Sequence, residues 1–181
     1  AMLNMANAIR AAQKTGLNTE KWVEFLKKAS DFHAERILEK TWKPTSTNEG
    51  FFIAPLVLSS RIFNNEKYLQ AADKAAGYYA DLYLNMKEVY WGGTLDASCE
   101  DKEGAFAALQ GFIELYDHTL EPKYLKWAKH AGDVCLTYTV VWDIPLPPGR
   151  LTDHSFKSRG WTAVSVQNMH IDVYGVLIAP Y

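Results

Sequence analysis

The stretch that decides the fold is Lys67-Tyr68-Leu69, followed by Ala72 and Ala75, because its pattern occurs three times in the chain. Lys123-Tyr124-Leu125, followed by small residues at 128 and 131, repeats it at an offset of 123 − 67 = 56 residues. Lys21-Trp22-Val23 gives a third occurrence, at 67 − 21 = 46 residues. A period of about fifty residues is typical of helical-repeat proteins, in which each unit is one supersecondary structure.

Each repeat contains two kinds of helix. Amphipathic helices, with apolar residues on one face and Lys, Glu and Asp on the other, are predicted over 20–38, 66–84 and 123–140. Helices that are apolar nearly all round are predicted over 51–63, 103–116 and 165–179, and a further helix over 2–14. Because a helix that is apolar on every side must be covered on every side, the alternation predicts an inner and an outer layer of helices.

Two details of this assignment depend on the residues themselves. The run 51–58 is also compatible with a strand, because it is short and rich in Phe, Ile and Val; we prefer a helix with Pro55 in its first turn or at a kink. Trp22 and Trp127 occupy repeat positions on the amphipathic helices, so we expect them in the core, and we expect Leu125 and Leu136 to face inward as well.

The predicted fold class is therefore all-α, built from repeated α-hairpins in a single domain spanning residues 1–181. A stack that closes on itself is an α/α toroid, and the alternative is an open α-solenoid. Long loops over 41–48, 86–99 and 141–161 all precede apolar helices, whereas the loops before amphipathic helices are short. Long loops on one rim are where a functional site is expected.

Composition excludes several classes of function. The net charge is −2, which gives no electrostatic footprint for nucleic acid, and no apolar run reaches the ~20 residues that cross a bilayer. Cys99 and Cys135 are too few for a disulfide framework, and neither Cys-x-x-Cys nor His-x-x-x-His spacing is present. We expect no cofactor and no metal. The start lacks the layout of a signal peptide, and a signal already removed would leave the same sequence, so localisation is not predicted.

The stretch Trp91 to Gly104 combines an aromatic Gly-Gly turn with a group of acids ahead of an apolar helix. Ser98 and Asp101 fit the capping signature of a helix start, where acids also suit the helix dipole at roughly 0.3–1 kcal/mol each. Helix-start chemistry alone would account for the acids from Glu100 onward. It does not account for Asp96 or for the Trp-Gly-Gly turn, so a site remains an open reading of this stretch.

The segments Gly93-Thr94-Leu95-Asp96 and Cys99 to Gly104, with Tyr116, Tyr124-Leu125 and Trp127-Ala128, resemble the six-hairpin glycosidases. That resemblance implies an (α/α)6 toroid that acts as a glycoside hydrolase on a polysaccharide or oligosaccharide, through paired carboxylates at its wide mouth. Only three and a half hairpins are present, about half of such a toroid. The resemblance thus implies a piece of a longer enzyme, or a chain that self-associates, with a carbohydrate as its other partner.

Candidate site residues follow from the helix starts and rim loops. The catalytic candidates are carboxylates at neighbouring inner-helix starts: Asp101 and Asp172, with Glu100 and Asp96 beside them. The substrate-binding candidates are rim aromatics and polar groups: Trp91, Trp142, Trp161, Asn168, His170 and Arg159. Structural roles compete in each case, since a loop tryptophan is often a packing anchor, His170 can be a hydrogen-bonded structural residue, and Arg159 can be a solvated charge.

Two other functions remain open. A polysaccharide lyase on the same fold would rely on Tyr90, His154, Arg159 and His170 rather than on paired acids. A helical-repeat protein that binds a partner without chemistry would need no clustered acids, but it gives no reason for the Gly-Gly and Pro-rich rim loops.

Overall fold

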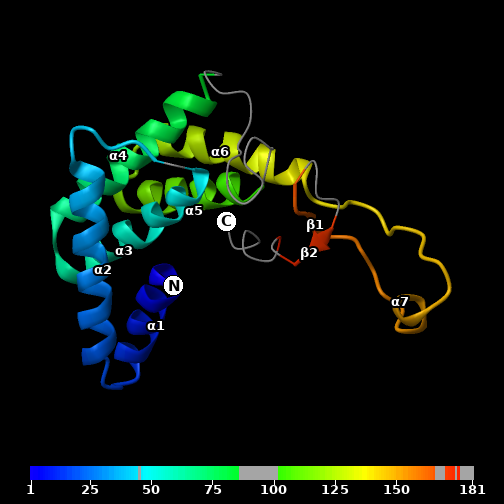
Figure 1. Cartoon of the computed structure of the whole chain (residues 1–181). Coiled ribbons are helices and arrows are strands. Elements are labelled where there is room, and N and C mark those ends of the chain that lie inside the picture. The colour runs from blue at the N-terminus through cyan, green and yellow to red at the C-terminus, as the bar shows by residue number, and fades with distance from the viewer. Residues whose placement is uncertain (45, 86–101, 166–169, 174, 176–181) are drawn as a thin grey trace.

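The computed structural model describes residues 1–44, 46–85, 102–165, 170–173 and 175, and over these residues the predicted all-α class is confirmed (Figure 1). The only strands in this part of the chain are two of two residues each. In chain order the elements are α1 (Met2–Lys14), α2 (Glu20–Leu38), the 3-10 helix η1 (Thr47–Phe52), α3 (Ile53–Phe63), α4 (Glu66–Tyr83), α5 (Lys102–Thr119), α6 (Pro122–Thr137), α7 (Arg150–Asp153), β1 (Thr162–Ala163) and β2 (Ile171–Asp172).

The ambiguous apolar run forms helix, as preferred from the sequence. Pro55 lies in the first turn of α3, where its missing N–H leaves no intrahelical hydrogen bond unmade. The helix ends at Asn64, which adopts the left-handed conformation with φ 47°. Asn65 then caps α4 by accepting a hydrogen bond from the Lys67 backbone N–H at 3.0 Å. Thr47 and Asn48, which were expected in the preceding loop, belong to η1 instead.

The inner layer is formed by η1 with α3 and by α5, which lie side by side and run in the same direction (Figure 1). Glycines set their separation. A methyl group added at Gly104 would lie 2.4 Å from Thr47 Oγ1, and one added at Gly111 would lie 2.6 Å from Ile53 Cβ. The reciprocal contact is at Gly50, where a methyl group would lie 3.3 Å from Ala107 Cβ. The Glu-Gly pair before each apolar helix therefore permits close approach of the two backbones.

The outer layer is held by the Lys-Tyr pair that opens α4 and α6. The Tyr68 hydroxyl donates a hydrogen bond to Asp31 of α2 at 2.6 Å, and Lys67 pairs with Glu35 of the same helix at 2.9 Å. In α6, the Tyr124 hydroxyl donates to Asp73 of α4 at 2.6 Å, with Lys123 3.2 Å from the same carboxylate. Each pair thus ties its helix to the preceding outer helix.

The core lies between the two layers and consists of small and aromatic side chains from α2 to α6, including Leu56, Tyr68, Phe106 and Phe112. Three residues expected inside are exposed: Trp22 on α2, and Leu125 and Leu136 on α6. They lie on the first and last outer helices, where no further hairpin covers them among the described residues. Closure into a toroid remains a prediction.

The helix predicted over 165–179 is wrong where the structure describes it. Ile171–Asp172 forms β2, which pairs antiparallel with β1 so that Thr162 faces Asp172 and Ala163 faces Ile171. An apolar run does not distinguish a helix from a strand, and β-branched residues at 162, 164, 171 and 173 favour the strand. Residues 166–169, 174 and 176–179 of the predicted helix lie outside the described residues.

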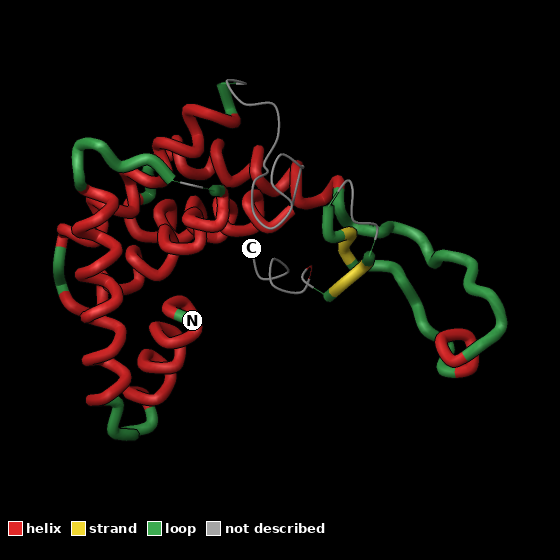
Figure 2. The backbone as a smooth tube through the Cα atoms, in the orientation of Figure 1, coloured by secondary structure: helices red, strands yellow, loops and turns green. Residues whose placement is uncertain are grey.

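The segment 141–161 is a long loop that extends away from the helices and contains one helical turn, α7 (Figure 2). Its two arms are joined by Ser158, whose hydroxyl bonds the Trp142 carbonyl at 3.0 Å and the Ile144 backbone N–H at 2.7 Å. No helix in the described part of the chain is both long and apolar enough to cross a membrane.

Candidate functional site

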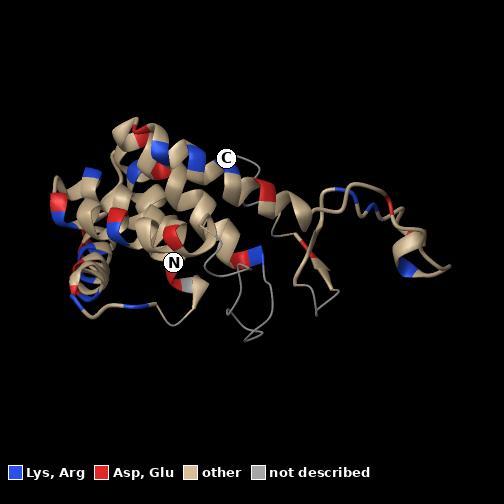
Figure 3. Cartoon of the chain, turned by 90° about the horizontal axis from the view of Figure 1, so that it is seen from above, with Lys and Arg blue, Asp and Glu red and all other residues tan. Residues whose placement is uncertain are grey.

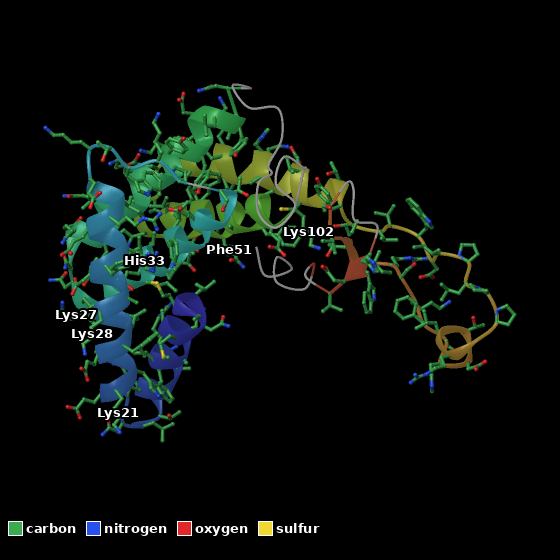
Figure 4. All side chains as sticks on the ribbon, viewed as in Figure 1. Lys21, Lys27, Lys28, His33, Phe51 and Lys102 are labelled. Atoms are coloured by element: carbon green, nitrogen blue, oxygen red, sulfur yellow. The ribbon has the colours of Figure 1, made fainter. Side chains whose placement is uncertain are left out.

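Buried polar side chains gather where η1 and α5 begin and where the β-strands meet α5. They are Thr47, Glu49, Lys102, Thr162 and Ser165, each less than a tenth exposed. Polar groups are costly to bury unless they are hydrogen-bonded. A cluster of buried polar side chains therefore indicates the end of the helical layers at which a site is expected. Figure 4 labels Lys102 at this end of α5 and Phe51 on η1.

Lys102 is fully buried, and its ammonium group lies 2.5 Å from Oδ2 of Asp172. The other carboxylate oxygen of Asp172, Oδ1, accepts a hydrogen bond from the Thr162 hydroxyl at 2.7 Å. Both oxygens of Asp172 are therefore engaged by protein groups. This arrangement fixes the β-strands against the start of α5, and it makes Asp172 a positioning residue rather than a free carboxyl group.

The start of η1 has a buried carboxylate. Glu49 pairs with Arg36 of α2, with Nη2 3.0 Å from Oε1. Beside it, the buried Thr47 hydroxyl lies against Gly104 and has no hydrogen-bond partner within the described part of the chain. These contacts link α2, η1 and α5 into one polar end of the molecule.

A cleft of about 520 Å³ lies between the start of α1, the middle of α2, the end of η1 and the middle of α5. Its aromatic lining comes from Phe25, Phe51 and Phe52, and its polar groups include His33 and Gln110. The His33 ring stacks on Phe52, with ring centroids 3.7 Å apart. Apolar and aromatic walls with a few polar groups are the usual composition of a small-molecule site.

His33 enters this cleft as a neutral ring at neutral pH. Burial lowers the pKa of His33 below its usual value of about 6.5, and the nearby Arg36 guanidinium lowers it further, against a smaller opposing effect of Glu49. A neutral imidazole offers one donor and one acceptor, and the Gln110 amide offers both as well. Together with the aromatic faces, these groups suit a neutral, hydroxyl-rich ligand.

The structure describes only some of the predicted catalytic residues. Asp96, Glu100 and Asp101 lie outside the described residues, as do Trp91 and Asn168 among the predicted binding residues. Asp172 lies on β2 rather than at a helix start, because the chain there pairs with β1. Its contact with Lys102 nevertheless brings it to the start of α5, next in sequence to Asp101.

The remaining predicted binding residues lie in the long loop 141–161 or shortly after it. Trp142 is exposed. Trp161 is half-buried and makes an edge-to-face contact with Phe156, with ring centroids 4.9 Å apart. Arg159 is exposed and pairs with Asp143 at 3.4 Å, which fits the solvated-charge reading. His170 is exposed immediately before β2. None of these four lines the cleft between α1, α2, η1 and α5.

Sequence reasoning missed the cleft residues and the buried lysine. Phe51 and Phe52 were assigned to the start of an apolar helix over 51–63. An apolar pattern alone does not show that these two residues line a cleft. Lys102 carries one signal in the sequence, since it is the single base among acids just before an apolar helix. A cation there opposes the helix dipole, so it requires a carboxylate partner, which Asp172 supplies.

Comparisons with protein-family models, curated proteins and solved structures found no match to this chain. Within the described residues, no group of three or more His, Cys, Asp or Glu side chains is placed to hold a metal ion.

Proposed function

We propose that this chain is part of a glycoside hydrolase that acts on a polysaccharide or oligosaccharide. The observation that carries the proposal is the side-by-side packing of η1 and α5. Their starts lie together among buried polar residues, and farther along the two helices border an aromatic-lined cleft. The resemblance of the Asp96 to Gly104 stretch to six-hairpin glycosidases supplies the reaction class. The cleft supplies a place for the sugar.

The lining of the cleft supports a carbohydrate as ligand. A sugar ring has an apolar C–H face, which packs on aromatic rings such as Phe51 and Phe25, and hydroxyl groups, which need both donors and acceptors. His33 and Gln110 provide these without a formal charge at neutral pH. The ligand in this proposal is therefore a neutral sugar rather than a uronic acid.

Hydrolysis needs two carboxyl groups, one protonated to assist the leaving group and one ionised as base or nucleophile. We assign these roles to the acids that precede α5, namely Asp96, Glu100 and Asp101. Asp172 is engaged by Lys102 and Thr162, so in this proposal it positions the start of α5 and takes no part in proton transfer. Buried support of this kind fixes the geometry on which catalysis depends.

Turnover of a panel of polysaccharides and their oligosaccharides by the 181-residue chain tests the proposal. We expect release of reducing ends, and a loss of about 10²–10⁴-fold in kcat for Asp101→Asn or Glu100→Gln, because removal of a proton-transfer group typically has that effect. The matched control is Asp153→Asn on the exposed turn α7, which should turn over at the parent rate.

Two results would contradict the proposal. One is a folded chain that neither binds nor hydrolyses any glycan in the panel. The other is parental activity in each of the variants Asp96→Asn, Glu100→Gln and Asp101→Asn. Binding of a glycan without turnover would favour the non-catalytic alternative.

A further inference from the structure

The first outer helix exposes an apolar stripe along one face. Trp22, Phe25 and Phe32 of α2 are 41%, 51% and 62% exposed. The repeat offset of 46 residues places Tyr68 and Ala71 of α4 at the positions of Trp22 and Phe25, and both are fully buried. The face that α4 packs against α2 is therefore the face that α2 leaves open.

The last hairpin exposes the complementary face. An apolar groove of about 350 Å³ runs between α5 and α6, with Leu109, Ile113, Leu125 and Leu136 among its lining residues. The offset of 56 residues relates Leu136 to Ala80 of α4, since 80 + 56 = 136. Ala80 is 4% exposed within the main core, whereas Leu136 is 64% exposed.

Ion pairs on α2 and α6 occupy equivalent positions in the repeat. Lys27 pairs with Asp31 on α2 at 2.7 Å, and Lys129 pairs with Asp133 on α6 at 2.9 Å. The two pairs are related by 133 − 31 = 102 and 129 − 27 = 102, which is the sum of the two repeat offsets, 46 + 56. On α2, Asp31 accepts the hydrogen bond from Tyr68, the aromatic residue of the next outer helix. On α4 the acceptor for Tyr124 is Asp73, one turn earlier in the repeat, since 73 − 46 = 27. Helix α6 thus carries a carboxylate, Asp133, at the position that receives the tyrosine on α2.

Helix α2 carries the residues that would donate hydrogen bonds in this contact. Lys21-Trp22 is the first occurrence of the pair that in Lys67-Tyr68 docks on Asp31 and Glu35. Lys21 makes no ion pair within the described part of the chain, and Figure 4 shows it at the end of α2 that is farthest from Lys102. The Trp22 indole N–H is a hydrogen-bond donor, as the tyrosine hydroxyl is.

We propose that a second copy of this chain docks the Lys21-Trp22 face of its α2 on the α5–α6 groove of the first, with Lys21 and Trp22 at Asp133. The occupant is a second copy because both halves of the contact, apolar and charged, are on this one chain. Helices α3, α4 and α5 separate α2 from α6 (Figure 1), so the two faces do not meet within one chain. Figure 3 shows Lys and Arg in blue and Asp and Glu in red along the helices, seen from above. The contact is heterologous, and it gives a closed ring or an open filament.

The proposal is independent of any activity on carbohydrates. Sedimentation velocity of the 181-residue chain over a wide range of concentration should show concentration-dependent association. Lys21→Glu and Asp133→Lys should each raise the dissociation constant by about tenfold or more, because each places like charges at the centre of the contact. The double variant Lys21→Glu/Asp133→Lys should recover most of the parental affinity, since it restores opposite charges in the swapped order.

Lys40→Glu and Asp153→Lys are the matched controls, since both residues are exposed and lie outside the two faces; they should associate as the parent does. Thermal melts establish that every variant is folded, and all four positions are exposed. A chain that stays monomeric at every concentration overturns the proposal. So does association that is unchanged in both single variants, or a double variant that is no tighter than either single one.

Discussion

At the scale of the residue, glycine decides how closely the inner helices approach. Gly111 of α5 faces Ile53 of α3, and an added methyl group would lie 2.6 Å from the Ile53 Cβ atom, which cannot rotate away. A methyl group added at Gly77 of α4 would have no other atom within 4 Å. The two positions are both in helices, so they differ in packing rather than in backbone conformation.

We therefore predict opposite effects of the same substitution. Gly111→Ala should lower the free energy of unfolding by about 1–3 kcal/mol, because overpacking forces the helices apart. Gly77→Ala should raise it by roughly 0.5–1 kcal/mol through helix propensity alone. Urea denaturation of both variants measures the difference. Equal effects of the two substitutions would mean that α3 and α5 do not pack closely at Gly111.

His33 gives a prediction about pH. Its folded-state pKa is lowered by burial, so below about pH 6.5 the unfolded chain binds a proton that the folded chain does not. The stability contributed by the neutral ring is full above the unfolded pKa, and it is lost as the pH falls through the folded pKa. We expect His33→Gln to reduce the decrease in unfolding free energy between neutral and mildly acidic pH, measured by urea denaturation.

The exposed His154→Gln is the control for replacing a histidine by glutamine at a surface position. If His33→Gln leaves the decrease unchanged from the parent, the His33 ring does not titrate with a lowered pKa in the folded chain.

At the scale of the element, the ion pair between Lys102 and Asp172 joins α5 to the strands. Asp172→Asn removes the negative charge beside a buried ammonium. Losing one partner of a fully buried pair costs about 3–5 kcal/mol, and because the Asp172 side chain is 27% exposed we expect about 1–3 kcal/mol. Chemical denaturation measures this directly.

Replacing both partners distinguishes an ion pair from simple packing. Lys102→Met/Asp172→Leu should cost less stability than Asp172→Asn alone, since no unbalanced charge remains buried. A double variant that is less stable than Asp172→Asn would contradict this account of the pair. Any loss of turnover in Asp172→Asn must also be corrected for unfolded protein, because the substitution is not structurally neutral.

Comparison of sequence and structure shows what periodicity determines. The first helix was predicted over its observed bounds, and α2 to α6 were placed to within a few residues, because apolar periodicity and the capping Asn65 are local signals. The helix predicted over 165–179 was wrong at β2, which pairs with β1 only nine residues earlier in the chain, since 171 − 162 = 9. An apolar run fits either a helix or a strand, so periodicity alone does not predict this pairing.

The candidate site was less predictable than the fold. Trp22 and Leu136 lie on the apolar faces that periodicity indicated, but periodicity does not tell whether a neighbour covers a face. The cleft depends on four separate elements meeting, which no single stretch reveals. The predicted acids Asp96, Glu100 and Asp101 lie outside the described residues and stay predictions.

At the scale of the whole molecule, we propose that the cleft between α1, α2, η1 and the middle of α5 binds a neutral sugar. The aromatic lining, the neutral His33 and the Gln110 amide all belong to this cleft. The α5–α6 groove, which we assign to a second copy of the chain, shares no lining residue with this cleft, whereas Phe25 belongs both to the cleft and to the stripe of α2 that docks.

Titration of the isotopically labelled 181-residue chain with neutral oligosaccharides, followed by NMR chemical shifts, tests this claim most directly. We predict that shifts cluster at Phe51, Phe52, His33 and Gln110, and that Phe51→Ala weakens binding by about tenfold or more, as loss of one aromatic anchor typically does. Shifts confined to the α5–α6 groove, or no shift with any oligosaccharide, would contradict the account.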